Sequence, residues 1–453
     1  MKILYLCAII YCLEDYIVLF EDRTNLNNLQ RILNRENNLI KTKKLLSSKS
    51  KIKHEFLNGF YGEMDEETIK KLEKEEEIAV IEKDSVVKIA NYKVMDIFLD
   101  AGNLHHERKE STIPLALQER APWGLSRVLG KSYVKSRQYI YPEDAGKDVE
   151  VFVIDTGINV LHPDFQGRAR WGANFVGGSL DTDDNGHGTH VAGVIGGFKY
   201  GISKKANIVA VKVLDANGVG MISKILKGID YVINEHEKKR ELLYDIASAK
   251  YLGKKRTPNL EKNLEEFINE SNLQPKTVVN MSVGGTKSVA LNFALDYAAS
   301  LGIHFAVAAG NDQQNACSYS PGSSKHAVTI GATDMHDKTA DFSNFGNCVD
   351  LYAPGVNILS AWNDRRWRVV SGTSMACPHV AGVMALYLGL AGFTPEALKN
   401  RLIKDAKNVI SADNANESIF KAMWPLNWFS DKEKLPLVST NKLIKKIIDK
   451  NNK

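Results

Sequence analysis

The chain has 453 residues, which is too long for one ordinary domain and long enough to bury a large core. A hydrophobic content of 44% and a charged content of 25% are typical of a soluble globular protein and exclude a disordered or fibrous chain. The net charge of +5 is weak for this length, and no stripe of Lys and Arg beside aromatic residues is present, so no nucleic-acid partner is expected.

The N-terminus has the pattern of a signal peptide, which we place at residues 1–18. An apolar run at 3–13 is too short to span a bilayer but suits the core of an export signal. A buried strand and an uncleaved anchor are the alternatives. No small-residue cleavage site follows the run, so the sequence does not define the cut position. No later run approaches the roughly 20 apolar residues of a membrane span. We therefore expect no transmembrane span and a protein of the secretory pathway that is secreted, held at the cell surface or delivered to a vacuole-like compartment.

Residues 19–112 form a second segment, rich in Lys, Glu and Asn, in which only residues from about 53 to 90 show ordered patterning. There, residues 54–62 are typical of a strand with a turn. Asp65 is placed to cap a helix that has an acidic first turn and apolar residues at helical spacing. Residues 78–89 predict two short strands joined by a polar turn. The segment therefore contains a small α+β module of its own.

A third segment, residues 113–424, alternates Gly-punctuated strands with helices. Such alternation requires right-handed crossovers between parallel strands. We therefore predict an α/β fold in which helices flank both faces of a parallel sheet. The predicted strands are 148–155, 209–214, 277–282, 303–308 and 327–331, and the predicted helices include 190–196 and 222–235.

Two segments do not fit this alternation. Residues from about 236 to 275 are rich in Lys and Glu and poor in apolar side chains, so we expect a partly helical surface insertion. Residues 425–453 form a basic tail, for which we expect a solvated terminus. An amphipathic helix on a membrane surface or a partner is the alternative for this tail.

Three short stretches carry reactive side chains. Asp155 follows four apolar strand residues, so it lies at the carboxyl edge of the predicted sheet, where open α/β folds bind ligands. Glycines flank His187 at a predicted helix start and leave its imidazole accessible. Ser374 begins another helix, where the dipole and backbone N–H groups favour a developing oxyanion. Taken singly, the three could equally be a turn residue, a metal ligand and a helix cap.

Asp155, His187 and Ser374 occur in this chain order, each with an intact flanking segment, and together they resemble the catalytic triad of the subtilisin-like serine proteases. Residues 121–127, 316–321 and 343–348 resemble segments of the proteinase K branch of that family. The resemblance implies a serine endopeptidase with Ser374 as nucleophile, His187 as general base and Asp155 as the group that orients it. It also implies that Asn311 supplies a side-chain N–H group to the oxyanion.

The resemblance further implies how a polypeptide substrate binds. The substrate would add a β-strand beside residues 218–220, so that main-chain contacts dominate, and residues 281–285 would form one wall of the specificity pocket. No cofactor is required for this chemistry, and we expect a monomer. The expected substrate-binding residues are Gly218, Val219, Gly220, Ser282, Val283, Gly284, Ala308 and Gly310.

Three structural features are also implied by the resemblance. The module at about 53–90 is similar to an inhibitory propeptide, an intramolecular inhibitor that blocks the cleft and that the enzyme removes itself. The segments around Cys317 and Cys348 resemble paired segments that carry a disulfide, which leaves Cys377 as a buried thiol. Asp350 falls where relatives place a calcium-binding carboxylate, so a structural calcium ion is an open alternative.

Other function classes fit the sequence less well. An α/β-hydrolase esterase needs Gly-x-Ser-x-Gly, but Ala376 stands two residues after Ser374. An ATP-binding loop ending at Gly130 would need a glycine where the chain has Leu125. A non-catalytic protein of the same fold usually lacks a triad or oxyanion residue. Within the enzyme class, residues 281–285 contain no acidic side chain, which favours broad, hydrophobic-leaning specificity over selective cleavage after basic residues.

Overall fold

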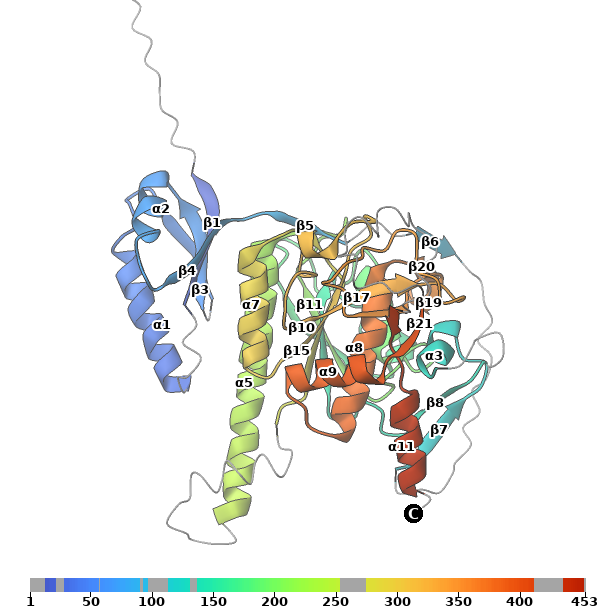
Figure 1. Ribbon diagram of the computed structural model, residues 1–453. Helices are drawn as coiled ribbons and strands as arrows, with labels where there is room; N and C mark the ends of the chain where they lie inside the picture. Colours follow the sequence, from blue (N-terminus) through green and yellow to red (C-terminus); the bar gives the residue numbers. More distant parts are fainter. Residues whose placement is uncertain are drawn as a thin grey trace, which may run out of the picture. The chain divides into compact units, whose positions relative to one another are not determined.

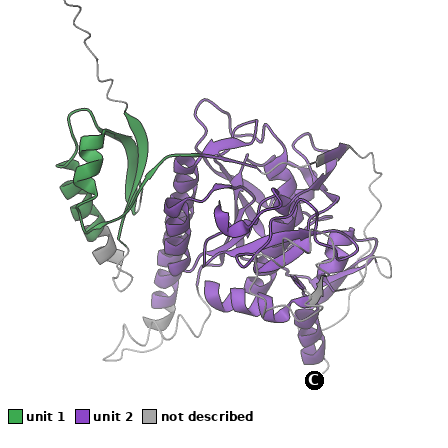
Figure 2. Cartoon of the chain, turned by 45° about the horizontal axis from the view of Figure 1, so that its top comes forward, with its two compact units in different colours: residues 1–85 green, residues 86–453 purple. Residues whose placement is uncertain are grey.

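The computed structural model describes residues 13–21, 28–56, 58–89, 93–96, 113–130, 137–252, 274–410 and 435–451. The chain divides into two compact units, residues 1–85 and 86–453 (Figure 2). Most of the apolar run expected to be a signal, up to residue 12, lies outside the described residues.

The first unit is an antiparallel sheet with two helices on one side (Figure 1). Its strand order is β2-β3-β1-β4, and buried apolar side chains from both helices and from β1 and β3 form one core, against which β2 and β4 pack. Asp65 caps the second helix, since its carboxylate accepts the Thr68 N–H at 2.9 Å, as the sequence predicts. The elements are β1 (Glu14–Phe20), α1 (Asn28–Lys43), β2 (Lys51–Phe56), β3 (Gly59–Met64), α2 (Glu66–Leu72) and β4 (Ile78–Lys83).

Strand β1 corrects two expected boundaries. It lies between β3 and β4, and Val18 and Phe20 are buried in the core of the unit. A signal peptide of residues 1–18 would remove most of this central strand and is therefore incompatible with the sheet. The module also begins at Glu14 rather than near residue 53, because β1 and α1 both contribute to its core. The apolar strand directly follows the apolar run at 3–13, so the sequence did not reveal this boundary.

The second unit is built on a nine-stranded sheet of order β10-β11-β9-β13-β15-β17-β18-β22-β21. All neighbouring strands are parallel except the last pair, β22 and β21. Its strands are β9 (Glu150–Asp155), β10 (Ala169–Asn174), β11 (Asn207–Lys212), β13 (Thr277–Met281), β15 (His304–Ala308), β17 (Val328–Thr333), β18 (Leu351–Pro354), β21 (Lys407–Ile410) and β22 (Leu435–Leu437).

Helices cover both faces of this sheet, which confirms the predicted α/β fold. The helices α5 and α7 pack together on one face, and α4 and α8 pack together on the other (Figure 1). Among the described residues only α8 is long and apolar enough to cross a membrane, and 89% of it is buried inside the protein, as befits a core helix. The helices are α3 (Trp123–Val128), α4 (His187–Gly196), α5 (Ile222–Leu252), α7 (Val289–Ser300), α8 (Thr373–Leu390), α9 (Pro395–Asp405) and α11 (Asn441–Asn451), with 3-10 turns η1 (Pro163–Phe165) and η2 (Ala316–Ser318).

Four small sheets complete the unit. They pair β5 (Val86–Lys88) with β12 (Val219–Met221), β14 (Gly285–Thr286) with β16 (Tyr319–Ser320), and β7 (Leu115–Gln118) with β8 (Tyr139–Pro142), and they join β6 (Lys93–Asp96) to β20 (Trp367–Ser371) and β19 (Ile358–Ala361). Two of them, β5 with β12 and β14 with β16, contribute residues to the pocket beside Ser374.

The two segments that break the sequence pattern belong in part to this unit. Helix α5 continues through Leu252 into the expected insertion and buries Ala247; residues 253–273 lie outside the described part. The expectation of a solvated C-terminal tail is wrong. Strand β22 joins the main sheet, and α11 buries Ile444 and Ile447 in the main core, because these residues lie one turn apart on one face of a helix whose other faces are basic.

Candidate active site

Asp155 and His187 meet at the carboxyl edge of the main sheet. Asp155 is the last residue of β9, and His187 is the first residue of α4. His187 Nδ1 lies 2.8 Å from Asp155 Oδ1 and 3.0 Å from Oδ2, and both side chains are fully buried. Because a carboxylate can only accept, Nδ1 carries the proton, and Nε2 of the neutral ring is the basic atom.

The carboxylate of Asp183 organises the loop that delivers His187. It accepts the Thr156 hydroxyl at 2.9 Å, the Gly186 N–H at 2.8 Å, and the Thr189 N–H and hydroxyl at 2.9 and 2.5 Å. These donors come from the end of β9 and the first turn of α4, so Asp183 ties together the two elements that carry Asp155 and His187. Asp183 is nearly buried, and the sequence analysis missed it because an Asp in a polar loop looks like a surface residue.

Two glycines allow the close approach at this loop. Gly186 has φ of 111°, in the left-handed region, and a Cβ there would collide with the indole of Trp362. A Cβ at Gly188 would collide with the carbonyl oxygen of Gly157. Gly188 instead donates its N–H to the Thr156 hydroxyl at 3.0 Å. A side chain at either position would therefore collide with a neighbouring segment, which explains why glycine stands on both sides of His187.

Lys212 also stabilises the segments that carry Asp155 and His187. It is the last residue of β11, paired in register with Asp155, and its side chain is fully buried. Its ammonium donates to the Thr156 carbonyl at 2.6 Å and to Asp184 Oδ1 at 2.7 Å. This lysine also escaped the sequence analysis, since its partners are adjacent to it only in space.

Ser374 lies at the start of α8, in contact with Ser282, the residue that follows β13. Its hydroxyl donates to the Ser282 carbonyl at 3.2 Å, and the Ser282 hydroxyl donates back to the Ser374 carbonyl at 2.9 Å. Ser374 is fully buried. The reciprocal pair fixes the first turn of α8 against the strand whose following residues line the pocket.

Asn311 is oriented by the residue before Ser374. Its Oδ1 accepts the Thr373 N–H at 2.9 Å and the Thr373 hydroxyl at 2.7 Å. An oxygen held by two donors sets the direction of the amide, so the NH₂ group turns away from Thr373. A Cβ at Gly372 would lie 3.1 Å from Nδ2, which places this donor beside the N-terminus of α8.

A pocket of about 400 Å³ adjoins Ser374. Most of its lining residues are glycine, alanine, serine or threonine, and Asp312, which is exposed, is its acidic member. Five of the residues expected to bind substrate line it, namely Ser282, Val283, Gly284, Ala308 and Gly310; the others are Val86, Lys88, Gly285, Thr286, Ala309, Asp312, Tyr319, Ser320, Gly322 and Ser374.

The remaining three expected substrate-binding residues lie across from this pocket, and the chain's own strand β5 runs between the two walls. On one side β5 is antiparallel to β12, with Lys88 opposite Val219 and Val87 opposite Gly220, and the Ile89 N–H donates to the Gly218 carbonyl at 2.9 Å. On the other side Lys88 exchanges two backbone hydrogen bonds of 3.1 and 3.0 Å with Gly284. Residues 86–89 are thus held as the middle strand of three.

A second segment of the chain pairs with the strand that leads to Ser374. Strand β6 is antiparallel to β20, from Lys93 opposite Ser371 to Asp96 opposite Arg368. Ser371 precedes Ser374 by only three residues. Residues 86–89 and 93–96 therefore both pair with segments close to Ser374.

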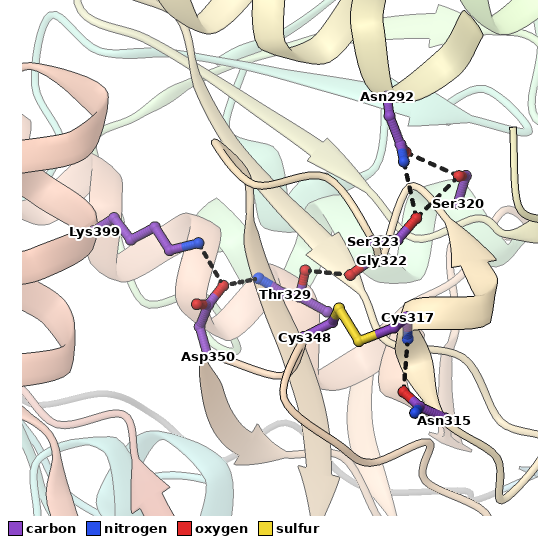
Figure 3. The surroundings of a disulfide bond; sticks show 10 residues. All are labelled: Asn292, Asn315, Cys317, Ser320, Gly322, Ser323, Thr329, Cys348, Asp350 and Lys399. Carbon is purple, nitrogen blue, oxygen red and sulfur yellow. Dashed lines mark hydrogen bonds and ion pairs between the residues drawn. A yellow bond between two sulfur atoms is a disulfide. The ribbon is translucent and has the colours of Figure 1, made fainter. Parts of the chain in front are cut away.

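The cysteines of the described residues have two different environments. Cys317 and Cys348 form a disulfide that joins η2 to the loop before β18 (Figure 3). Cys377 is free and buried one turn after Ser374, and its thiol donates to Asn280 Oδ1 at 3.2 Å. Burial raises the pKa of this thiol well above its ordinary value, which disfavours a reactive thiolate.

Comparison with known families decides the identity of the fold and its chemistry. The model of the Subtilase family matches residues 146–422, and that of Peptidase inhibitor I9 matches residues 15–90. The chain belongs to the subtilase family. It is a serine-type endopeptidase with an N-terminal I9 inhibitor domain, and the I9 match begins within β1, in agreement with the strand's place in the first unit.

Relatives of this subtilase extend over most of its length. It is 40% identical to a protein named as a subtilisin-like proteinase from Encephalitozoon cuniculi, over 98% of both chains. It is 38% identical to the subtilisin-like serine protease Pen c 2 of Penicillium citrinum, over 80% of this chain and 73% of that protein. A cold-adapted subtilisin-like serine proteinase of known structure shares 36% identity, with a TM-score of 0.55, over 71% of this chain and 98% of the other.

Proposed function

We propose that Asp155, His187 and Ser374 form the catalytic triad of this subtilase. His187 takes the proton of the Ser374 hydroxyl as that oxygen attacks the scissile carbonyl, and returns it to the leaving amine. Asp155 holds the imidazole in the tautomer with the proton on Nδ1 and stabilises the imidazolium. Water then hydrolyses the acyl-enzyme by the same proton route. The observation that carries this proposal is the 2.8 Å contact of His187 with Asp155 in a fully buried pair.

The proposed oxyanion hole combines a backbone and a side-chain donor. The Ser374 N–H lies in the first turn of α8, where backbone N–H groups point outward and the helix dipole favours negative charge. Asn311 adds its amide NH₂, in the direction that Thr373 imposes. Such a side-chain donor stabilises the transition state by about 3 to 4 kcal/mol.

Substrate polypeptides are proposed to bind where β5 now lies, as an added strand between β12 and Gly284. Main-chain hydrogen bonds on both sides supply most of the affinity, which makes the sequence requirement loose. Small residues make up most of the lining of the pocket beside Ser374, which leaves room for an apolar side chain before the cut. Asp312 stands exposed in the lining, so peptides with Leu, Phe or Arg at this position test the proposed hydrophobic preference.

We further propose that the enzyme cuts its own chain between Ile89 and Lys93. In the antiparallel register that pairs Lys88 with Gly284, the residue two positions later in a bound peptide falls opposite Ser282, the partner of Ser374. In this sequence that residue is Ala90. The proposed first cut therefore follows Ala90, some twenty residues before the boundary near 112 that composition suggested, and residues 86–89 would remain in the cleft as the inhibitory end of the I9 domain.

Export is proposed on two observations. The apolar run at 3–13 suits a signal core, and the disulfide of Cys317 and Cys348 is typical of proteins in oxidising compartments. The sheet of the first unit requires that a signal peptidase cut before Glu14.

The deciding experiment compares the full precursor with its Ser374→Ala variant by gel mass, N-terminal sequencing and a fluorophosphonate probe. Ser371→Ala is the matched control. We expect the precursor and the control to yield a new N-terminus at Asn91 and to react with the probe, while Ser374→Ala stays whole and unlabelled. Failure of the precursor to label or to hydrolyse casein would reject the triad. Labelling with a new N-terminus outside residues 90–93 would reject only the proposed cut.

A further inference from the structure

The sequence left a calcium ion at Asp350 as an open alternative, and oxygen atoms suited to a cation are gathered there. Asp350 Oδ2 lies near the carbonyl oxygens of Lys325 and Ala327, which precede β17. A carboxylate and two backbone carbonyls that converge on one point are the ligand type of a hard cation. Among the described residues, however, no group of three or more His, Cys, Asp or Glu side chains is gathered at this point or elsewhere.

The point at which these oxygens converge is filled by an ammonium group. Lys399 Nζ lies 2.9 Å from the Lys325 carbonyl, 2.8 Å from the Ala327 carbonyl and 2.9 Å from Asp350 Oδ2 (Figure 3 shows the contact with Asp350). An ammonium has three N–H donors, and here each has one oxygen acceptor. A calcium ion would need the same position, so the residues present do not fit the metal while Lys399 is in place.

We propose that Lys399 is a built-in cation that replaces calcium at Asp350 and makes this corner of the subtilase fold independent of the metal. The lysine extends from α9 and ties this helix to the segment before β17 and to the residue that precedes β18. Its position is fixed by the neighbouring Leu398 and Leu402, which are buried in the main core. The ammonium cannot diffuse away or be chelated, as a bound ion can.

The surroundings of Asp350 show why a cation is needed there. The side chains of Asp350 and Lys399 are only 17% and 18% exposed. Burial raises the pKa of Asp350, and the Lys399 charge and the Thr329 N–H, at 2.9 Å, oppose that rise. Without Lys399 the largely buried carboxylate would lose its counter-charge and each of the two carbonyl oxygens would lose a donor, which is destabilising.

The test measures thermal unfolding of the Ser374→Ala precursor, which cannot digest itself, in EDTA and in about 10 mM calcium chloride, above the millimolar affinity of open extracellular sites. Lys399→Ala is introduced into this background, with Lys404→Ala, an exposed lysine of the same helix, as matched control. We expect Lys399→Ala to lower Tm in EDTA by about 3 °C or more. Calcium should restore part of this loss, and Lys404→Ala should behave as the parent does.

Two further variants keep the test decisive. Asp350→Asn added to Lys399→Ala should abolish the calcium-dependent gain, which assigns the gain to this site. If Lys399→Ala does not fold, Lys399→Gln keeps one N–H donor, removes the charge and should show the same gain on a smaller loss. The proposal is overturned if Lys399→Ala leaves Tm unchanged in EDTA. It is equally overturned if Asp350→Asn removes a calcium response that the parent already has. Neither outcome depends on the proposed catalytic roles.

Discussion

His187 Nδ1 lies 2.8 Å from Asp155 Oδ1 although 32 residues separate them in the chain. The contact arises because one residue ends a central strand and the other begins the helix that packs over that strand. Both side chains are fully buried, so each is the partner that the other requires. This pairing fixes the orientation of the His187 ring through a residue that lies 32 positions earlier in the chain.

Asp155→Asn should therefore abolish most activity without unfolding the enzyme. An amide in place of the carboxylate favours the imidazole tautomer with the proton on Nε2, which cannot accept the serine proton, and kcat should fall about 10⁴-fold. Hydrolysis of a chromogenic peptide at neutral pH measures the loss, with Asp341→Asn, an exposed aspartate, as control. A loss below about tenfold would show that Asp155 has no role in orienting His187.

Asn311→Ala should lower kcat with little effect on KM. The amide acts on charge that develops only in the transition state, so its removal should cost about 10² to 10³ in kcat. Steady-state kinetics on a peptide amide separates the two constants, and Asn207→Ala, at an exposed position, is the control. A rise in KM with unchanged kcat would instead assign Asn311 to substrate binding.

The sequence predicted most of the fold and the three proposed catalytic residues, because their signals are local. One apolar strand ends in Asp155, glycines flank His187, and a glycine lies two residues before Ser374. The pairings that the sequence analysis missed join residues distant in the chain. Lys399 and Asp350 lie on different elements that only the folded sheet brings together, and Asp183 lies in a polar loop whose burial the sequence does not reveal. Strand β1 was missed because it adjoins an apolar run of another kind.

Substitution of the buried strand residue Val87 tests whether β5 must occupy the cleft before self-processing. Val87 is 1% exposed and its neighbour Val86 is 55% exposed, although both belong to β5. Val87→Asp should slow the appearance of the cut precursor at least tenfold, because an unpaired carboxylate would have to be buried. Val86→Asp places its carboxylate at an exposed position and should slow processing much less than Val87→Asp, although Val86 lines the pocket beside Ser374. Equal rates for both variants, followed on gels over time, would show that docking of β5 does not limit the reaction.

Asp183 should be required for both stability and rate. Removing its carboxylate in Asp183→Ala leaves the Thr156, Gly186 and Thr189 donors without their acceptor, and we expect a loss of about 2 to 4 kcal/mol in the free energy of unfolding. Asp183→Asn keeps one acceptor oxygen and should recover part of the stability. If Asp183 positions His187, the recovered stability should bring recovered kcat with it, whereas a purely structural role would leave kcat per folded molecule unchanged in both variants.

The buried Lys204 should make stability depend on pH above neutrality. Its ammonium donates to the carbonyls of Phe198 and Gly201 and lies over the rings of Tyr139 and Tyr141. Burial lowers the pKa of Lys204 from 10.5 to about 7, an effect that nearby Asp164 opposes and Arg168 reinforces.

Between pH 7 and 10.5 the unfolded chain thus keeps a proton on Lys204 that the folded protein has lost, so the free energy of unfolding rises with pH over this range. Below pH 7 both states carry the charge, and its burial is a constant cost. Burial raises the pKa of Asp164 above 3.8, so its ionisation lowers the free energy of unfolding as pH rises above that value. Lys204→Met in the Ser374→Ala precursor should flatten the rise measured by urea unfolding from pH 7.5 to 10. Parallel curves for the two proteins would show that Lys204 keeps its proton in the folded state.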